Sequence, residues 1–318
     1  MAEAFKLAIL DDYQCVASSF ANWGSVDVLD VTPIQNHISD PTELVRVLME
    51  FDAVLLMRER TEFPASVIAR LPNLKLLVTT GMKNASVDIA AARQRGIIVC
   101  GTRSSPVPPA ELTWALVLAL LRDIPDQVNH ARQGRWQTSV GATASGRRLG
   151  LLGLGRIGTI VARYGQAFDM DVVAWSPNLT PERAASVGVT AVSKAELFSG
   201  SDIVSVHIRA VESTRGIVGP AEIAAMKSTA YLVNTSRAEL VDEGALVSAL
   251  SSGSIAGAGI DVFTREPADK ADPLISLPNV IPTPHLGYVT QGNYRTFYED
   301  ALECVARYLA GDPVRVIE

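Results

Sequence analysis

One short stretch near the middle of the chain restricts the fold more than any other part of the sequence. It contains Gly153, Gly155 and Gly158 in the spacing G-x-G-x-x-G, directly after the apolar run at 149–152. A helical pattern of apolar residues begins at Arg156. A strand, a glycine turn and a helix in this order are typical of domains that bind a dinucleotide, because backbone N–H groups and the helix dipole then face the pyrophosphate. Glycines also occur in ordinary turns, but the flanking strand and helix favour the nucleotide-binding interpretation.

Composition and charge exclude several other classes of protein. The chain has 318 residues, enough for about two domains, and its formal net charge of −6 favours neither nucleic acid nor an anionic membrane. Its cysteines, Cys15, Cys100 and Cys304, are scattered and lack the spacing of metal ligands. We see no secretory signal in residues 1–10, and the longest apolar run, 112–121, is too short to span a bilayer. We therefore expect a cytoplasmic protein without a metal site.

Short apolar runs alternate with helical patterns along most of the chain. In the first hundred residues we predict strands at 7–10, 26–31, 53–57, 74–78 and 97–100. A second series is predicted at 149–153, 172–175, 189–192, 203–206, 230–234, 257–261 and near 280–282. Such alternation indicates parallel sheets covered by helices on both faces, so the fold class is α/β with two doubly wound domains.

The domain boundaries follow from the segments that interrupt this alternation. Residues 101–109 contain three prolines and read as a linker, followed by an apolar helix at 110–122. Pro125 interrupts the helical pattern, and a polar segment follows up to Arg148. A last helix near 290–309 has no strand after it, so we expect it to return to the first domain. This gives one discontinuous domain of residues 1–101 and 291–318 and a second domain of residues 102–290.

Three polar stretches at predicted strand ends suggest a reaction. Arg237 follows one strand, Asp261 ends the next with Glu266 five residues later, and His285 lies in a turn before the last helix. A guanidinium can bind the carboxylate and polarise the carbonyl of a 2-keto acid. A histidine can supply a proton when hydride reaches the keto carbon, and a carboxylate beside its ring fixes the tautomer. Each residue alone is also compatible with a surface ion pair or a loop, but all three belong to the carboxyl edge of one sheet, where ligands bind.

The sequence resembles the D-isomer-specific 2-hydroxyacid dehydrogenase family over essentially its whole length. The matching stretches are Leu149–Gly158, Asn234–Glu243, Gly259–Pro267 and Thr283–Gly287. The resemblance implies a Rossmann dinucleotide-binding domain inserted in a flavodoxin-like substrate-binding domain. It also implies NAD(P)-dependent reduction of a 2-keto acid to a D-2-hydroxy acid by a homodimer, with Arg237, Glu266 and His285 as catalytic residues.

The same resemblance assigns ligand contacts. Cofactor contacts are expected from Gly153, Gly155, Arg156, Ile157 and Gly158 at the pyrophosphate, from Ser176 and Asn178 near the ribose, and from Thr235, Ser236 and Asp261 near the nicotinamide. His207 matches another position on the cofactor side. Met82, Lys83 and Asn84 match a loop whose N–H groups hold the substrate carboxylate. Lys83 replaces a glycine there. Either it favours a substrate with a second anionic group or its side chain points to solvent. Arg58 and Arg60 follow a predicted strand, but the sequence gives little support for placing them at the substrate.

The choice of dinucleotide is less strongly marked. Family members that use NAD carry an acid at the position of Ser176, and an arginine there would favour NADP. This chain has neither in the turn, and the nearest base, Arg183, is expected on the following helix. We expect NAD or NADP, with a slight preference for NAD.

Several related functions remain open at this point. Formate dehydrogenase is disfavoured, because it pairs its histidine with glutamine rather than with a residue such as Glu266. Glyoxylate or hydroxypyruvate reductase and a phosphoglycerate dehydrogenase-like activity stay as alternatives. A dinucleotide-sensing corepressor-like binding protein is an alternative of another class, since such proteins keep the same polar residues.

Overall fold

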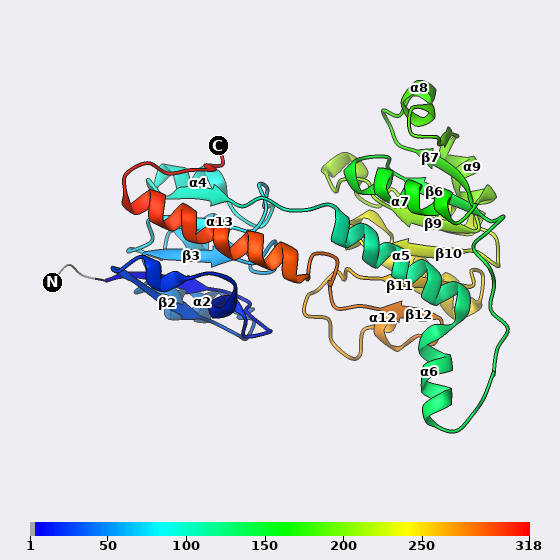
Figure 1. The fold of residues 1–318 in the computed structure, drawn as a ribbon, viewed down its shortest axis with the longest axis horizontal. Coiled ribbons are helices and arrows are strands. Elements are labelled where there is room, and N and C mark those ends of the chain that lie inside the picture. Colours follow the sequence, from blue (N-terminus) through cyan, green and yellow to red (C-terminus); the bar gives the residue numbers. More distant parts are fainter. Residues whose placement is uncertain (1–3) are drawn as a thin grey trace. The chain divides into compact units, whose positions relative to one another are not determined.

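The computed structural model describes residues 4–318, and the chain forms two compact units (Figure 1). Unit 1 contains the chain up to Ser105 and again from Thr290 to Glu318, and unit 2 is Pro106–Val289. Each unit is built on one parallel sheet with helices packed on it. Among residues 4–318, no helix has both the length and the apolar character needed to cross a bilayer.

Unit 1 has a five-stranded sheet in the order β2-β1-β3-β4-β5. Its strands are β1 Phe5–Ile9, β2 Leu29–Pro33, β3 Ala53–Leu56, β4 Leu76–Thr79 and β5 Ile98–Gly101. This order is that of flavodoxin-like folds and confirms the predicted fold class for this part of the chain. The prediction for the second strand was wrong by three residues at its start, because Trp23–Ser25 form a 3₁₀ turn that Val26 closes by donating to the carbonyl of Trp23.

The helices of unit 1 cover both faces of this sheet. They are α1 Ala17–Phe20, η1 Trp23–Ser25, α2 Pro41–Leu48, α3 Ala65–Ile68, α4 Ile89–Gln94 and α13 Gln291–Leu309. The start of α2 is fixed by Asp40, whose carboxylate accepts from the N–H groups of Thr42 and Glu43. Helix α13 runs across one face of the sheet (Figure 1) and buries Tyr294, Phe297 and Tyr298. The last helix of the chain thus belongs to the same unit as the first strands.

Unit 2 has seven parallel strands in the order β12-β11-β10-β9-β6-β7-β8. They are β6 Arg148–Leu152, β7 Asp171–Trp175, β8 Thr190–Ala191, β9 Ile203–Val206, β10 Tyr231–Asn234, β11 Gly257–Ile260 and β12 Val280–Pro282. The first strand of the unit, β6, lies in the interior of the sheet, and the strand order reverses between β6 and β9. This is the topology of a Rossmann domain, and its ligands bind at that reversal, outside the carboxyl ends of the strands.

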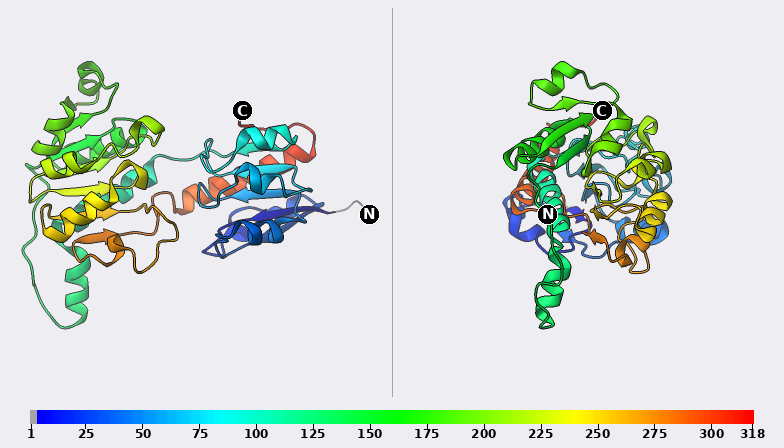
Figure 2. Two further views of the ribbon diagram at one scale, coloured as in Figure 1. Left: turned by 180° about the vertical axis from the view of Figure 1, so that it is seen from behind. Right: turned by 90° about the vertical axis from the view of Figure 1, so that its right-hand side faces the viewer.

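Two apolar cores lie on the two faces of the unit 2 sheet, under separate layers of helices (Figures 1 and 2). Helices α5 and α7 pack on one face, and α9, α10 and α11 pack on the other. The elements of the unit are α5 Val107–Arg122, α6 Ile124–Arg132, α7 Arg156–Ala167, α8 Pro181–Ala185, α9 Lys194–Gly200, η2 Glu212–Thr214, α10 Pro220–Ala225, η3 Ala238–Leu240, α11 Glu243–Ser252 and α12 Pro273–Ser276.

The sequence prediction was wrong in two places between residues 101 and 148. Helix α5 begins at Val107 rather than Ala110, because prolines in the first helical turn need no N–H partner. Residues 124–132 form helix α6, where no helix was predicted. Pro125 lies in the first turn of this helix, which begins at Ile124 after Asp123 turns the chain with a φ of 52°. Figure 1 shows α6 projecting from the body of unit 2, and none of its residues is buried.

Candidate active site

The glycine turn between β6 and α7 contains glycines of two kinds. Gly153 has a φ of 103°, and a Cβ on it would lie 2.7 Å from the backbone of His207. A Cβ on Gly158 would lie 2.2 Å from the carbonyl oxygen of Gly153. The packing of the turn itself therefore requires these two glycines.

Gly155 is not required by packing. Apart from Gly155 itself and its two chain neighbours, no described residue has an atom within 4 Å of the position that its Cβ would take. Its φ of −88° suits any residue. Its missing side chain leaves open space in front of the first N–H groups of α7, which have no partner within the helix. An anion can approach the backbone there, so the turn fits a dinucleotide pyrophosphate. Arg156 and Ile157 are the first two residues of α7.

Polar side chains at the ends of β9 and β10 are bonded to neighbouring groups, and one of these bonds joins the two loops. His207 follows β9, and its Nε2 lies 2.8 Å from the hydroxyl of the buried Ser205. Burial lowers the pKa of His207 to about 4, so the ring is neutral at pH 7. After β10, the Ser236 hydroxyl donates to the carbonyl of Ile208 at 3.0 Å, and the hydroxyls of Thr235 and Thr113 are 2.6 Å apart.

A buried asparagine shapes the turn that carries Arg237. Asn234 is the last residue of β10, and its amide donates to the carbonyl of Arg237 at 2.9 Å. Its side-chain oxygen accepts from the N–H of Ser236 at 3.0 Å. The guanidinium of Arg237 donates to the carbonyl of Ser236 at 2.6 Å and is partly exposed. Asparagine favours such turns because its side chain can bond to the backbone two or three residues on, and the sequence analysis did not use this signal.

His285 and Glu266 are in direct contact, as predicted for an acid–base pair. Nδ1 of His285 is 2.5 Å from Oε2 of Glu266, and Oε1 of Glu266 accepts from the N–H of Phe263 at 3.0 Å. Both side chains are mostly but not fully buried, with 17% and 23% of their surface exposed. His285 has a φ of 52°, a left-handed conformation that is uncommon for a residue with a side chain. The contact fixes Nδ1 of the ring, so Nε2 is the nitrogen available for a reaction.

Asp261 holds the histidine turn in place. It is fully buried at the end of β11, and one carboxylate oxygen accepts from the Thr283 hydroxyl and the Leu286 N–H, both at 2.7 Å. The other oxygen accepts from the N–H of Gly287 at 2.9 Å. Burial raises the pKa of Asp261, and these hydrogen bonds act in the opposite direction. The turn that carries His285 is therefore bonded to the neighbouring strand end on both of its sides.

The remaining predicted ligand residues lie at other strand ends. Ser176 and Asn178 follow β7, with Ser176 partly buried and Asn178 exposed. In unit 1, Met82 and Lys83 are exposed after β4, and no hydrogen bond from their N–H groups to another described group is found. Asn84 is buried, and its amide donates to the carbonyl of Arg58 at 2.7 Å and to the Thr79 hydroxyl at 2.8 Å.

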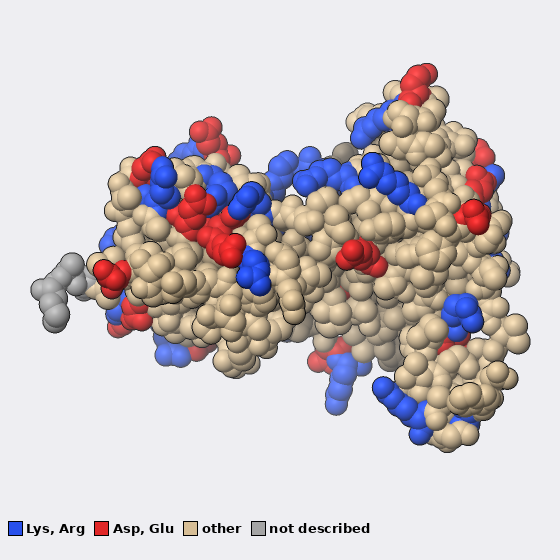
Figure 3. All heavy atoms as spheres, viewed as in Figure 1, with Lys and Arg blue, Asp and Glu red and all other residues tan. Residues whose placement is uncertain are grey.

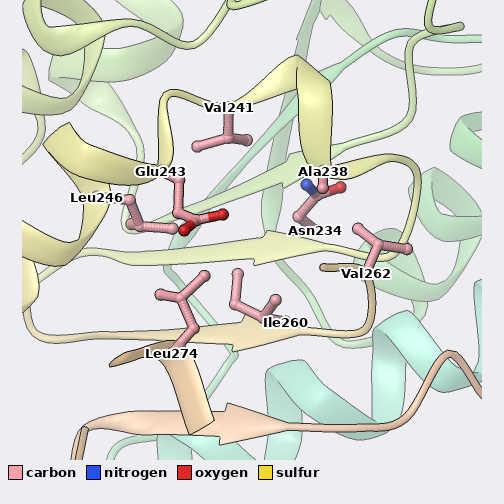
Figure 4. Close-up of a pocket in the computed structure, with 8 residues that line it drawn as sticks. All are labelled: Asn234, Ala238, Val241, Glu243, Leu246, Ile260, Val262 and Leu274. Atoms are coloured by element: carbon pink, nitrogen blue, oxygen red, sulfur yellow. The ribbon is translucent and has the colours of Figure 1, made fainter. Parts of the chain in front are cut away.

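Two further features bear on the extent of the site. A small pocket in unit 2 lies between α11 and the ends of β10 and β11, with Asn234 and Glu243 as its polar lining (Figure 4). Its other lining residues are apolar, and none of the three predicted catalytic residues belongs to it. Within residues 4–318, no group of three or more His, Cys, Asp or Glu side chains is arranged to hold a metal ion.

A parallel sheet in Rossmann order and a glycine turn open to an anion define unit 2 as a dinucleotide-binding domain, and a histidine and a carboxylate are in contact at its strand ends. Comparison with known proteins gives the same class. Residues 114–287 match the model of the "D-isomer specific 2-hydroxyacid dehydrogenase, NAD binding domain". This chain belongs to the D-isomer-specific 2-hydroxyacid dehydrogenase family.

Individual relatives agree with this assignment. A solved structure of a phosphoglycerate oxidoreductase from Vibrio cholerae O395 is 40% identical, with a TM-score of 0.93, and the match covers 96% of this chain and 99% of that one. A putative D-3-phosphoglycerate dehydrogenase from Ralstonia solanacearum is 37% identical, also with a TM-score of 0.93, over 98% and 96% of the two chains. D-3-phosphoglycerate dehydrogenase of Archaeoglobus fulgidus is 34% identical over 86% of this chain. The chain spans only about half the length of such curated relatives, 52% in that case.

Proposed function

We propose that this protein reduces a 2-keto acid to a D-2-hydroxy acid with NAD(P)H, as a D-2-hydroxyacid dehydrogenase. The observation that supports the proposal most is the contact of 2.5 Å between His285 and Glu266 on a domain of NAD-binding type. When bound, the nicotinamide supplies the hydride, or accepts it in the reverse direction. The protein's own residues then have to bind the substrate, hold it and move one proton.

His285 is the proposed proton donor. Glu266 accepts from Nδ1–H, which leaves Nε2 to protonate the oxygen of the keto group as negative charge develops on it. In the oxidation direction the same nitrogen removes the proton from the hydroxyl group. Glu266 stabilises the protonated ring in both directions, because its carboxylate lies against it.

Arg237 is the proposed substrate-binding cation. Its backbone is fixed by Asn234, and a guanidinium can bind a carboxylate with two parallel hydrogen bonds while polarising the adjacent carbonyl. An ammonium group cannot reproduce this planar geometry. Asp261 acts through the turn that it holds, so we assign it a positioning role.

For the dinucleotide we propose contacts from the glycine turn and from the strand ends of unit 2. Gly153, Gly155, Arg156, Ile157 and Gly158 would surround the pyrophosphate, and Ser176 and Asn178 would lie near the adenosine ribose. His207, Thr235 and Ser236 would lie on the nicotinamide side. Because His207 is neutral at pH 7, it adds no charge next to the reacting ring.

In unit 1 we propose that the N–H groups of Met82 and Lys83 bind the substrate carboxylate. The Asn84 amide is already bonded within the loop, so we propose that Asn84 shapes the loop and contributes its backbone rather than its side chain. Lys83 is exposed and would favour a substrate with a second anionic group. If so, Lys83→Ala lowers kcat/KM for dianionic keto acids more than for pyruvate, and an equal effect on both would refute this role.

The substrate itself is best identified by direct assay. NADH and NADPH oxidation should be measured with pyruvate, glyoxylate, hydroxypyruvate, phenylpyruvate, 2-oxoglutarate and phosphohydroxypyruvate. The panel separates a general 2-keto acid reductase from a glyoxylate or hydroxypyruvate reductase and from a phosphoglycerate dehydrogenase-like enzyme. Tight dinucleotide binding without turnover of any of these acids would instead favour a dinucleotide-sensing protein.

We also propose that the protein is a cytoplasmic homodimer. The segment formed by α6 and the following loop, residues 124–140, exposes Ile124, Val128, Trp136 and Val140, with 79% of the Trp136 surface and all of the Val140 side chain accessible. Large apolar side chains gathered on a projecting segment are typical of a protein–protein interface. A second copy of the chain is the partner that the family resemblance implies.

A further inference from the structure

The turn after β7 bears on the choice between NADH and NADPH. In Rossmann domains a carboxylate at this strand end accepts from the ribose 2′-hydroxyl and repels a 2′-phosphate. Here β7 ends at Trp175 and is followed by Ser176, Pro177 and Asn178, and the first acidic residue is Glu182 on α8. The turn therefore lacks a carboxylate that would repel a 2′-phosphate.

An arginine on the next helix, Arg183 on α8, reaches the glycine turn. The guanidinium of Arg183 donates through Nη2 to the carbonyl of Leu154 at 3.2 Å, and Leu154 lies between the first two glycines of the phosphate-binding turn. The helix that carries Arg183 is fixed at its start, because the Thr180 side chain accepts from the Arg183 N–H at 3.3 Å. The sequence analysis expected Arg183 on the helix after the ribose turn. In the structure it lies on that helix, and its side chain contacts the glycine turn.

The neighbouring charges leave this guanidinium available to an anion. Arg183 is exposed, and a single hydrogen bond to Leu154 leaves most of its N–H donors to other partners. Arg156 adds a second exposed cation at the first position of α7. The carboxylate of Glu182 is held on α8 by its own N–H and by Thr180, both of which lower its pKa. Figure 3 shows Lys and Arg side chains on the visible face over α7 and beside α8.

We propose that unit 2 prefers NADPH to NADH, with Arg183 binding the 2′-phosphate and Ser176 donating to it. The proposal reverses the slight preference for NAD that the sequence alone gives. It rests on the proposed function only in requiring that a dinucleotide binds at the glycine turn.

The test is a binding measurement that needs no turnover. Affinities of 2′,5′-ADP and of 5′-AMP, which differ only in the 2′-phosphate, are compared by isothermal titration calorimetry at low ionic strength. We expect 2′,5′-ADP to bind about 10- to 100-fold more tightly, the range that charge-assisted hydrogen bonds to a phosphate provide. Arg183→Gln should remove most of this difference in affinity. Arg163→Gln removes an exposed arginine from α7 instead and should leave the difference unchanged.

Several results would overturn the proposal. Equal affinity for the two mononucleotides would refute it, as would an Arg183→Gln variant that keeps the full preference. Ser176→Asp provides a second check, because the added carboxylate should weaken binding of 2′,5′-ADP without weakening that of 5′-AMP. Equal binding of NADH and NADPH would refute the preference and leave the proposed dehydrogenase function intact. Failure of both dinucleotides to bind would refute the two together.

Discussion

At the scale of single residues, the proposed chemistry depends on Glu266 acting as a charge rather than only as a hydrogen-bond acceptor. Oε1 of Glu266 accepts from the Phe263 N–H, and Oε2 contacts His285. A glutamine can keep the first bond, but its amide carries no charge to stabilise a protonated imidazole.

Glu266→Gln should therefore lower kcat for keto-acid reduction by about 10-fold or more. The amide can keep the bond to the Phe263 N–H, but it removes the negative charge beside the ring that gives and receives the proton. The measurement is kcat with NAD(P)H and the best substrate of the panel. An unchanged kcat would remove Glu266 from the proton-transfer pair.

The residues of the site differed in how well the sequence predicted them. The contact between Glu266 and His285 could be predicted, because a carboxylate is a common partner of an imidazole and because strand ends of one parallel sheet meet at one edge. The supporting roles of Asn234 and Asp261 were not recognised from the sequence. Asp261 bonds to a turn 22 to 26 residues away, and nothing in the local pattern specifies which buried carboxylate receives those N–H groups.

At the scale of elements, the glycine turn allows a matched pair of substitutions. Gly155→Ala should leave thermal stability nearly unchanged, since no described atom beyond the two chain neighbours lies within 4 Å of the new methyl group, but should weaken dinucleotide binding at least about 10-fold. Gly158→Ala should instead lower the melting temperature, because its Cβ would meet the Gly153 carbonyl at 2.2 Å. Unchanged dinucleotide affinity in Gly155→Ala would place the pyrophosphate elsewhere.

The end of β9 makes stability depend on pH. The pKa of His207 is about 4 in the folded protein, below the value of about 6.5 that is usual in an unfolded chain. The unfolded state therefore gains a proton first, and folding stability falls as the pH drops from about 6.5 towards 4. At pH 5 the loss is at most about 2 kcal/mol.

His207→Gln should reduce this acid sensitivity while keeping a polar contact with Ser205. Urea unfolding at pH 7.5 and pH 5 measures the difference for both proteins. A variant that loses as much stability between the two pH values as the unsubstituted protein would show that His207 does not titrate as described.

Secondary structure was predicted well where the apolar pattern was strong and poorly where it was weak. Both parallel sheets could be predicted, because runs such as Ala53–Leu56 are buried along their whole length. Helix α6 was missed because its apolar pattern is short, limited to Ile124, Val128 and Ala131, and is not buried against the rest of the unit. Pro125, in its first turn, was also read as an interruption.

At the scale of the whole molecule, the exposed segment of residues 124–140 predicts association. Size-exclusion chromatography with light scattering should give the mass of a dimer for the unsubstituted protein. Trp136→Glu together with Val140→Glu should shift the mass towards that of a monomer, because a charge in an apolar interface is costly to bury. Exposed Phe168→Glu, outside this segment, is the control. A dimer that persists in the double variant would place the interface elsewhere.

We propose that this chain reduces a 2-keto acid with His285 as the proton donor. The most direct test compares NAD(P)H oxidation by the unsubstituted protein and by His285→Gln on the best substrate of the panel. The unsubstituted protein should turn over, and the variant should lose about 10²- to 10⁴-fold in kcat while binding the dinucleotide normally. A variant that reduces the keto acid at the unsubstituted rate would contradict the account.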